Sequence, residues 1–65
     1  MQVKINGRVE QLAPCTIETL VRQRGLKPEA LVVEHNLKII QQALWSGIAL
    51  REGDTLELLS FVGGG

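Results

Sequence analysis

The chain has 65 residues, of which 45% are hydrophobic and 22% charged, and its formal net charge at pH 7 is zero. This length predicts one domain, and the composition is ordinary for a soluble globular protein. Lys and Arg are scattered and Trp45 and Phe61 are the only aromatic residues, which argues against a nucleic-acid-binding protein. No apolar run approaches the roughly 20 residues of a membrane span, and no signal-peptide pattern opens the chain. We therefore expect a soluble, cytoplasmic domain without nucleic-acid or membrane partners.

A β-hairpin is predicted at the N-terminus. Polar and apolar residues alternate over residues 2–5, as in a half-buried strand. Asn6-Gly7 follows, and this pair favours a type I′ turn, which needs positive φ at both central positions. Residues 8–12 form the return strand, whose alternation slips between Val9 and Leu12, so we expect a bulge or an early strand end.

A short helix is predicted over residues 16–24. Thr16 is a suitable N-cap, and Gly25 suits the left-handed position just after the helix. A helix of this length does not persist alone. Its apolar residues recur on one face, so they should pack on a sheet: Ile17, Leu20 and Val21.

The second half of the chain is predicted to supply three further strands. They cover residues 31–35, 38–40 and 55–62, with a weaker Asn36-Leu37 turn between the first two. Residues 41–46 have no clear period, residues 48–50 suit a short extended piece, and residues 51–54 form a tight turn. The order is β-β-α-β-β-β, which predicts an α+β fold: a mixed sheet of four or five strands with one helix on one face. A right-handed crossover then places the last strand beside the first.

Enzyme and metal motifs are missing from the sequence. There is no phosphate-binding loop and no dinucleotide signature, and one His with one Cys cannot supply a usual metal site. The single Cys15 excludes an intrachain disulfide and fits a reducing compartment. A catalytic Cys15–His35 pair would lack a third orienting group, so we favour unrelated roles for the two residues. Trp45 is best explained as a lid over one end of the core, and Glu52 and Asp54 as turn residues and solvated charges.

The C-terminal residues Gly63, Gly64 and Gly65 follow an apolar strand without a spacer. Extended, these three residues reach roughly 10 Å beyond the domain. Without Cβ atoms they can enter a slot that admits only backbone. We therefore expect a folded domain over residues 1–62 and a flexible tail over residues 63–65, which presents the carboxylate of Gly65 to a partner's active site.

The final strand should also carry a docking surface. Leu56 and Leu58 fall on one face of the strand, and Leu59 and Phe61 fall on the other. Because a single helix covers only one face, Leu59, Phe61 and Val62 are candidates for partly exposed residues that bind a partner. The alternative is that residues 41–50 cover them.

Several motifs together resemble the ThiS family. They are the β-β-α-β order, Asn6-Gly7, Val33-Glu34-His35-Asn36, Arg51-Glu52-Gly53-Asp54 and the terminal Phe61-Val62-Gly63-Gly64-Gly65. ThiS proteins are small sulfur carriers of thiamine biosynthesis with a ubiquitin-like β-grasp fold. The resemblance covers nearly the whole chain. Family members often carry Arg in place of His35, and glycine or a charged residue in place of Leu37.

The resemblance implies a carrier that partner enzymes act on, and not an enzyme. An adenylyltransferase similar to ubiquitin-activating enzymes would use ATP and Mg²⁺ to adenylate Gly65, so the chain itself would bind no cofactor. Sulfur from a cysteine desulfurase or a persulfide protein would then give a thiocarboxylate, which thiazole synthase would consume. The alternatives are the small subunit of molybdopterin synthase, also a sulfur carrier, and a β-grasp interaction domain with an inert tail.

Overall fold

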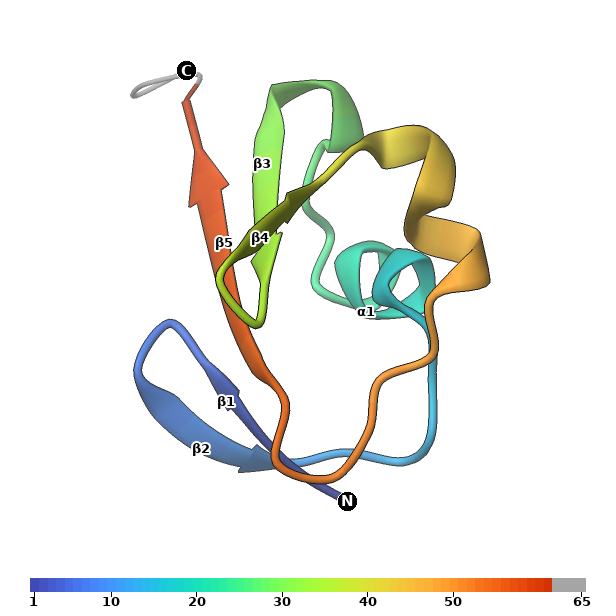
Figure 1. Ribbon diagram of the computed structural model, residues 1–65. Coiled ribbons are helices and arrows are strands. Elements are labelled where there is room, and N and C mark those ends of the chain that lie inside the picture. Colours follow the sequence, from blue (N-terminus) through green and yellow to red (C-terminus); the bar gives the residue numbers. More distant parts are fainter. Residues whose placement is uncertain (62–65) are drawn as a thin grey trace.

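Five strands form one mixed sheet, and a single α-helix lies against one of its faces in the computed structural model (Figure 1). The structure describes residues 1–61, so the predicted boundary between domain and tail at residue 62 lies outside the described residues. The elements in chain order are β1 (Gln2–Ile5), β2 (Arg8–Gln11), α1 (Ile17–Gln23), the 3-10 helix η1 (Pro28–Ala30), β3 (Leu31–His35), β4 (Lys38–Ile40), the 3-10 helix η2 (Gln42–Gly47) and β5 (Thr55–Ser60).

The N-terminal hairpin has the predicted turn. Asn6 and Gly7 have φ values of 50° and 83°, as a type I′ turn requires. The pairing of β1 with β2 is uninterrupted from Ile5↔Arg8 to Gln2↔Gln11. Leu12, just after β2, continues the same pairing through hydrogen bonds with Met1, so there is no bulge. The alternation is irregular because Val9 is exposed whereas Leu12 packs against the core.

Helix α1 begins and ends at the predicted caps. The Thr16 hydroxyl accepts a hydrogen bond from the Thr19 N–H at 3.2 Å. At the other end Gly25 has φ +67°, its N–H donates to the Arg22 carbonyl, and the Leu26 N–H donates to the Val21 carbonyl. This pair of bonds is a Schellman motif, which satisfies carbonyls that the helix end leaves without partners.

Strand β5 lies at the centre of the sheet, whose strand order is β2-β1-β5-β3-β4. It runs parallel to β1 and antiparallel to β3, so the last strand lies beside the first, as predicted. In Figure 1 this strand rises through the middle of the sheet toward the C-terminus.

The segment between β4 and β5 contains a 3-10 helix that the sequence pattern did not predict. Trp45 of η2 is buried, and its indole N–H donates to the Ile40 carbonyl at 2.9 Å, so its predicted role as a lid on the core is confirmed. After η2, Ala49 forms an isolated antiparallel bridge with Thr16. The expected extended piece over residues 48–50 is therefore present and joins the start of α1.

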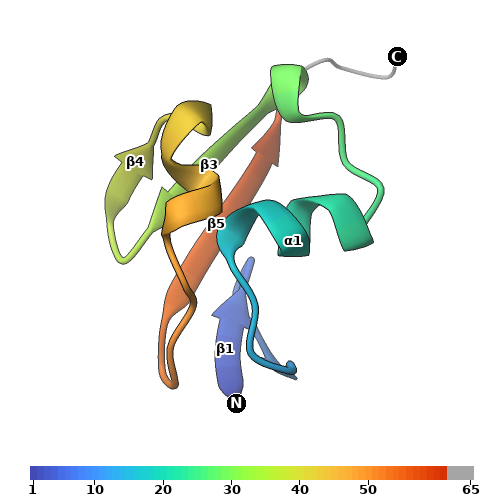
Figure 2. The same cartoon turned by 90° about the vertical axis from the view of Figure 1, so that its right-hand side faces the viewer.

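The hydrophobic core lies between one face of the sheet and the layer formed by α1 and η2, which Figure 2 shows in front of the strands. Among the described residues, no helix has the length and apolar character needed to cross a membrane. The opposite face of the sheet carries no helix in the described part of the chain. The buried residues of the core are Val3, Ile5, Ile17, Leu20, Val21, Leu31, Val33, Trp45, Leu50, Leu56 and Leu58.

Candidate functional site at the end of strand β5

The last residues of β5 are held in place by β3. The two strands pair from His35↔Leu56 to Leu31↔Ser60, and the Phe61 N–H extends this pairing with a 3.0 Å hydrogen bond to the Ala30 carbonyl. Since β5 is the central strand, the segment that follows Phe61 starts from a fixed position in the fold.

Leu59 and Phe61 are exposed on the face of the sheet opposite the helix. Their side chains keep 55% and 64% of their surface accessible, and the cross-strand neighbour of Leu59 is the half-buried Val32. Residues 41–50 do not cover them, because this segment lies with α1 on the other face, where the Ile17 N–H donates to the Ile48 carbonyl. The predicted exposure of both side chains is thus confirmed, while their predicted role in docking stays a prediction.

The remaining predicted site residues lie outside the described residues. They are Val62, predicted to extend the docking surface, and Gly63, Gly64 and Gly65, predicted to enter partner active sites. Their roles stay predictions.

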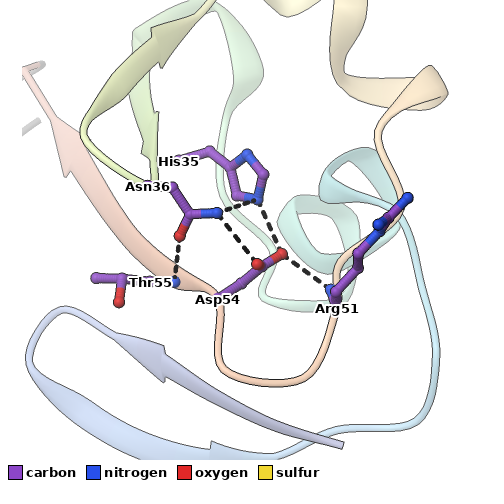
Figure 3. A network of polar contacts seen from close by, with 5 residues as sticks. All are labelled: His35, Asn36, Arg51, Asp54 and Thr55. Carbon is purple, nitrogen blue, oxygen red and sulfur yellow. Dashed lines mark hydrogen bonds and ion pairs between the residues drawn. The ribbon is translucent and has the colours of Figure 1, made fainter.

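A network of polar contacts fixes the other end of β5 (Figure 3). One carboxylate oxygen of Asp54, Oδ2, accepts hydrogen bonds from His35 Nε2 and from the Arg51 N–H, both at 2.9 Å. The other, Oδ1, accepts one from Asn36 Nδ2 at 3.1 Å. The Asn36 amide oxygen in turn accepts from the Thr55 N–H at 2.9 Å. The network therefore joins the β3–β4 turn to the first residue of β5.

The expectation that Asp54 is a solvated turn charge is wrong. Its side chain is buried. Burial alone raises the pKa of the carboxyl group, but hydrogen bonds from His35, Asn36 and the Arg51 backbone, together with the charge of His35, lower the pKa below its ordinary value. The residue is a buried hydrogen-bond acceptor, and the contacts explain its position without a catalytic role.

Cys15 and His35 have separate surroundings, in line with unrelated roles for the two residues. The His35 ring contacts Asp54 and Asn36, whereas the half-buried Cys15 packs against the hydrophobic core. Within residues 1–61 there is also no group of three His, Cys, Asp or Glu residues placed to hold a metal ion.

The Asn36-Leu37 turn forms in spite of its weak sequence signal. Both residues have positive φ, 50° and 72°, and the turn closes on the His35↔Lys38 pair. Positive φ is uncommon for a leucine, which has no compensating side-chain hydrogen bond. The bonds from the Asn36 side chain to Asp54 and Thr55 explain how the turn is stabilised.

Sequence reasoning missed a second role of Asn6. Its amide oxygen accepts from the Leu58 N–H at 2.7 Å, and its Nδ2 donates to the Leu58 carbonyl at 3.3 Å. The side chain thus takes the place of a neighbouring strand's peptide group at the middle of β5. The two residues are 52 positions apart, and the Asn6-Gly7 pair is already explained by its turn, so no local pattern indicated the contact.

Comparison with known proteins agrees with this geometry. The chain is 35% identical to a thiazole synthase of Paramagnetospirillum magneticum and 32% identical to one of Magnetococcus marinus, over 66 aligned positions in each case. Both alignments cover all of this chain but only 20% of the relative, so the chain spans about a fifth of the length of these proteins.

Two solved structures from Geobacter metallireducens share the fold. A crystal structure of a thiamine biosynthesis protein (ThiS) matches with a TM-score of 0.85 at 23% identity, and the match covers all of both chains. A solution structure of a thiamine biosynthesis protein matches with a TM-score of 0.81 at 25% identity, over all of this chain and 88% of the other. The model of the ThiS family matches residues 3–65. With this match over nearly the whole chain and a five-stranded ubiquitin-like β-grasp fold, the chain belongs to the ThiS family.

Proposed function

We propose that this chain is a sulfur carrier for the formation of the thiazole ring of thiamine, with Gly65 as the group that carries the sulfur. The observation that carries the proposal is the combination of a ThiS-family match over residues 3–65 with a central strand, β5, whose last residue, Ser60, is separated in sequence from the terminal glycines by only Phe61 and Val62. The described residues near the end of β5 offer backbone hydrogen bonds and exposed apolar side chains. We therefore assign the sulfur-transfer chemistry to the tail and to partner enzymes.

The proposed chemistry begins with activation, because a carboxylate is a poor electrophile. An adenylyltransferase similar to ubiquitin-activating enzymes joins the Gly65 carboxylate to the AMP part of ATP and releases pyrophosphate. ATP and Mg²⁺ are bound by that enzyme. A persulfide from a cysteine desulfurase or a persulfide protein displaces AMP, and cleavage of the sulfur–sulfur bond by a thiol leaves the thiocarboxylate on Gly65.

The second partner is thiazole synthase, which takes up the sulfur. The two curated relatives support this choice over the molybdopterin pathway, because both are thiazole synthases of which a segment similar to this chain forms about a fifth. All of these steps are expected to take place in the cytoplasm.

The tail (residues 63–65) and the docking surface (Leu59, Phe61 and Val62) contribute to partner recognition in different ways. Residues 62–65 span at most about 13–14 Å when extended, which places any enzyme that holds Gly65 against the end of β5. Glycines allow the partner to bring its reactive atoms close to the terminal carbonyl. Leu59 and Phe61 are the apolar side chains nearest to that end on the open face of the sheet, and their burial would contribute to binding.

Deletion of Gly65 tests the proposal in cells. The truncated chain should fail to rescue a strain that lacks its own thiamine sulfur carrier, while its circular dichroism and thermal midpoint remain those of the full chain. The full chain should rescue thiamine auxotrophy and not molybdopterin auxotrophy. Rescue of thiamine auxotrophy by the truncated chain, or rescue of the molybdopterin strain alone, would contradict the proposal.

A further inference from the structure

One edge of β5 is left without a neighbouring strand beside its last residues. Strand β1 pairs with β5 only at Lys4↔Thr55 and Ile5↔Leu56, because the chain then turns away at Asn6-Gly7. Strand β3, on the other side, continues to Ser60. Figure 1 shows that the β1–β2 hairpin lies beside the lower end of β5. The upper part of β5 has a neighbouring strand, β3, on one side only.

The hydrogen bonds show which backbone groups face the open side. The Thr55 carbonyl accepts from the Asn36 N–H, and the Phe61 N–H donates to Ala30, so the odd-numbered residues of β5 face β3. The N–H and carbonyl groups of Leu56, Leu58 and Ser60 therefore point the other way. A hydrogen bond supports this assignment: the Leu56 carbonyl accepts from the N–H of Asn6, the residue that follows β1, at 2.9 Å.

Ser60 differs from Leu56 and Leu58, the other two residues of β5 whose backbone groups face away from β3. The Asn6 side chain occupies both backbone groups of Leu58. For Ser60, by contrast, residues 1–61 provide no partner on the open side, neither for the N–H nor for the carbonyl. An extended peptide can pair with an exposed strand edge by forming hydrogen bonds with such an unpaired N–H and carbonyl.

A groove runs beside this edge. Its apolar surface comes from side chains that the sheet and the loop after α1 contribute, and Arg24, which is ion-paired with Glu10, also lines it. A strand laid along Ser60 would place alternate side chains into this groove. The residues that line it are Asn6, Arg24, Leu26, Leu31, Leu58 and Ser60.

In the proposed function, the residues after Phe61 extend into the active site of the partner that holds Gly65, so they are engaged there and not with Ser60. The Phe61 N–H continues the β3–β5 pairing through its bond to the Ala30 carbonyl. We therefore look for the occupant of this edge in the partner that approaches this end of the domain.

We propose that an extended segment of the thiazole synthase partner adds to β5 as an edge strand at Ser60, with an apolar side chain in the groove beside Leu58. This inference rests on the proposed function, which places the synthase within about 14 Å of Phe61 when it holds Gly65. The contact is small, and small contacts of this kind gain most from a covalent link that raises the effective concentration. The two thiazole synthases that contain a segment similar to this chain fit that expectation.

Amide hydrogen exchange on the wild-type chain tests the pairing directly. In the free chain, the Ser60 amide should exchange quickly, while the Phe61 and Leu58 amides, already bonded to Ala30 and Asn6, should be protected. Saturation with the cognate thiazole synthase should slow exchange at Ser60 at least about tenfold and leave Leu58 and Phe61 nearly unchanged. Unchanged exchange at Ser60 in the saturated complex would overturn the proposal.

Ser60→Pro provides the matching perturbation. Proline removes the N–H and fills the open edge, yet no described hydrogen bond of the free chain is lost. Ser60→Ala keeps the N–H and is the control. We expect Ser60→Pro to weaken binding of the unmodified chain to the synthase about tenfold and Ser60→Ala to bind like the wild type, with both variants folded by thermal denaturation. Equal affinities for the two variants would overturn the proposal.

The activating enzyme serves as the second arm of the test. With the activating enzyme, ATP and a persulfide donor, Ser60→Pro should still form the thiocarboxylate at the wild-type rate, as followed by mass spectrometry. Protection of Ser60 by the activating enzyme and not by the synthase would overturn the assignment to the synthase. Protection by the synthase of a chain that never gains sulfur would uphold the strand pairing and contradict the proposed function, so the two failures are distinguishable.

Discussion

Leu59→Thr is expected to weaken binding to the activating enzyme without unfolding the domain. Complete burial of a leucine side chain contributes about 1.5–3 kcal/mol. The Leu59 side chain is 55% exposed in the free chain, so a partner that covers it gains about 0.8–1.7 kcal/mol from the remaining surface. Its loss raises the dissociation constant by up to about 4- to 18-fold. Threonine preserves the preference for a strand, so the free energy of unfolding should change by less than about 1 kcal/mol.

Leu44 supplies a matched control for this measurement. It is 56% exposed, almost the same as Leu59, but it lies in η2 on the helix side of the sheet. Isothermal titration calorimetry of the wild type, Leu59→Thr and Leu44→Thr with the activating enzyme then separates the position of an apolar side chain from its exposure. Equal dissociation constants for the two variants would refute the assignment of Leu59 to the docking surface.

Three further predictions concern the contacts that hold β5 and the β3–β4 turn. Asn6→Gly keeps the positive φ but removes both bonds to the Leu58 backbone, and should lower the free energy of unfolding in urea by about 1–2 kcal/mol; wild-type stability would show that these bonds contribute nothing. The pKa of Asp54 is lower in the folded chain than its ordinary value of 3.8, so the carboxylate stabilises the fold above that pH and loses this contribution as the pH falls through the folded pKa. The stability difference between the wild type and Asp54→Asn, from urea denaturation, should therefore shrink from about pH 5 to about pH 2, and a constant difference would contradict this account. Leu37→Gly removes a left-handed leucine that is 88% exposed, and should raise stability by about 0.5–1 kcal/mol after the entropy cost of glycine; a lower thermal midpoint would refute the strain argument.

Local chemistry was sufficient to predict the elements whose ends are set by single residues. Asn6-Gly7 determines the first turn through its φ values, and Thr16 and Gly25 determine the ends of α1 through hydrogen bonds within the same segment. The place of β5 beside β1 followed from the handedness of the crossover and not from any residue.

The elements that the sequence did not predict depend on distant contacts. The 3-10 helix η2 has no amphipathic period to detect, and it is anchored by the burial of Trp45 and its bond to Ile40. Asp54 lies in a turn motif that is usually solvated, but its partners His35 and Asn36 are 19 and 18 residues away. Such contacts appear only when the fold has brought the two segments together.

The candidate site shows the same division. The outward direction of Leu59 and Phe61 follows from strand alternation, and the structure confirms it. The open edge at Ser60 could not be predicted, because it depends on where β1 stops pairing with β5 and on the amide of Asn6 that occupies Leu58.

The central claim, that Gly65 carries sulfur, is tested most directly by mass spectrometry of the C-terminal peptide. The intact chain is incubated with the cognate activating enzyme, ATP, Mg²⁺ and a persulfide donor, and a parallel reaction omits ATP. The account predicts replacement of one oxygen by sulfur on Gly65, only in the complete reaction. A C-terminal peptide of unchanged mass in the complete reaction, with an enzyme shown to be active on its own carrier, would contradict it.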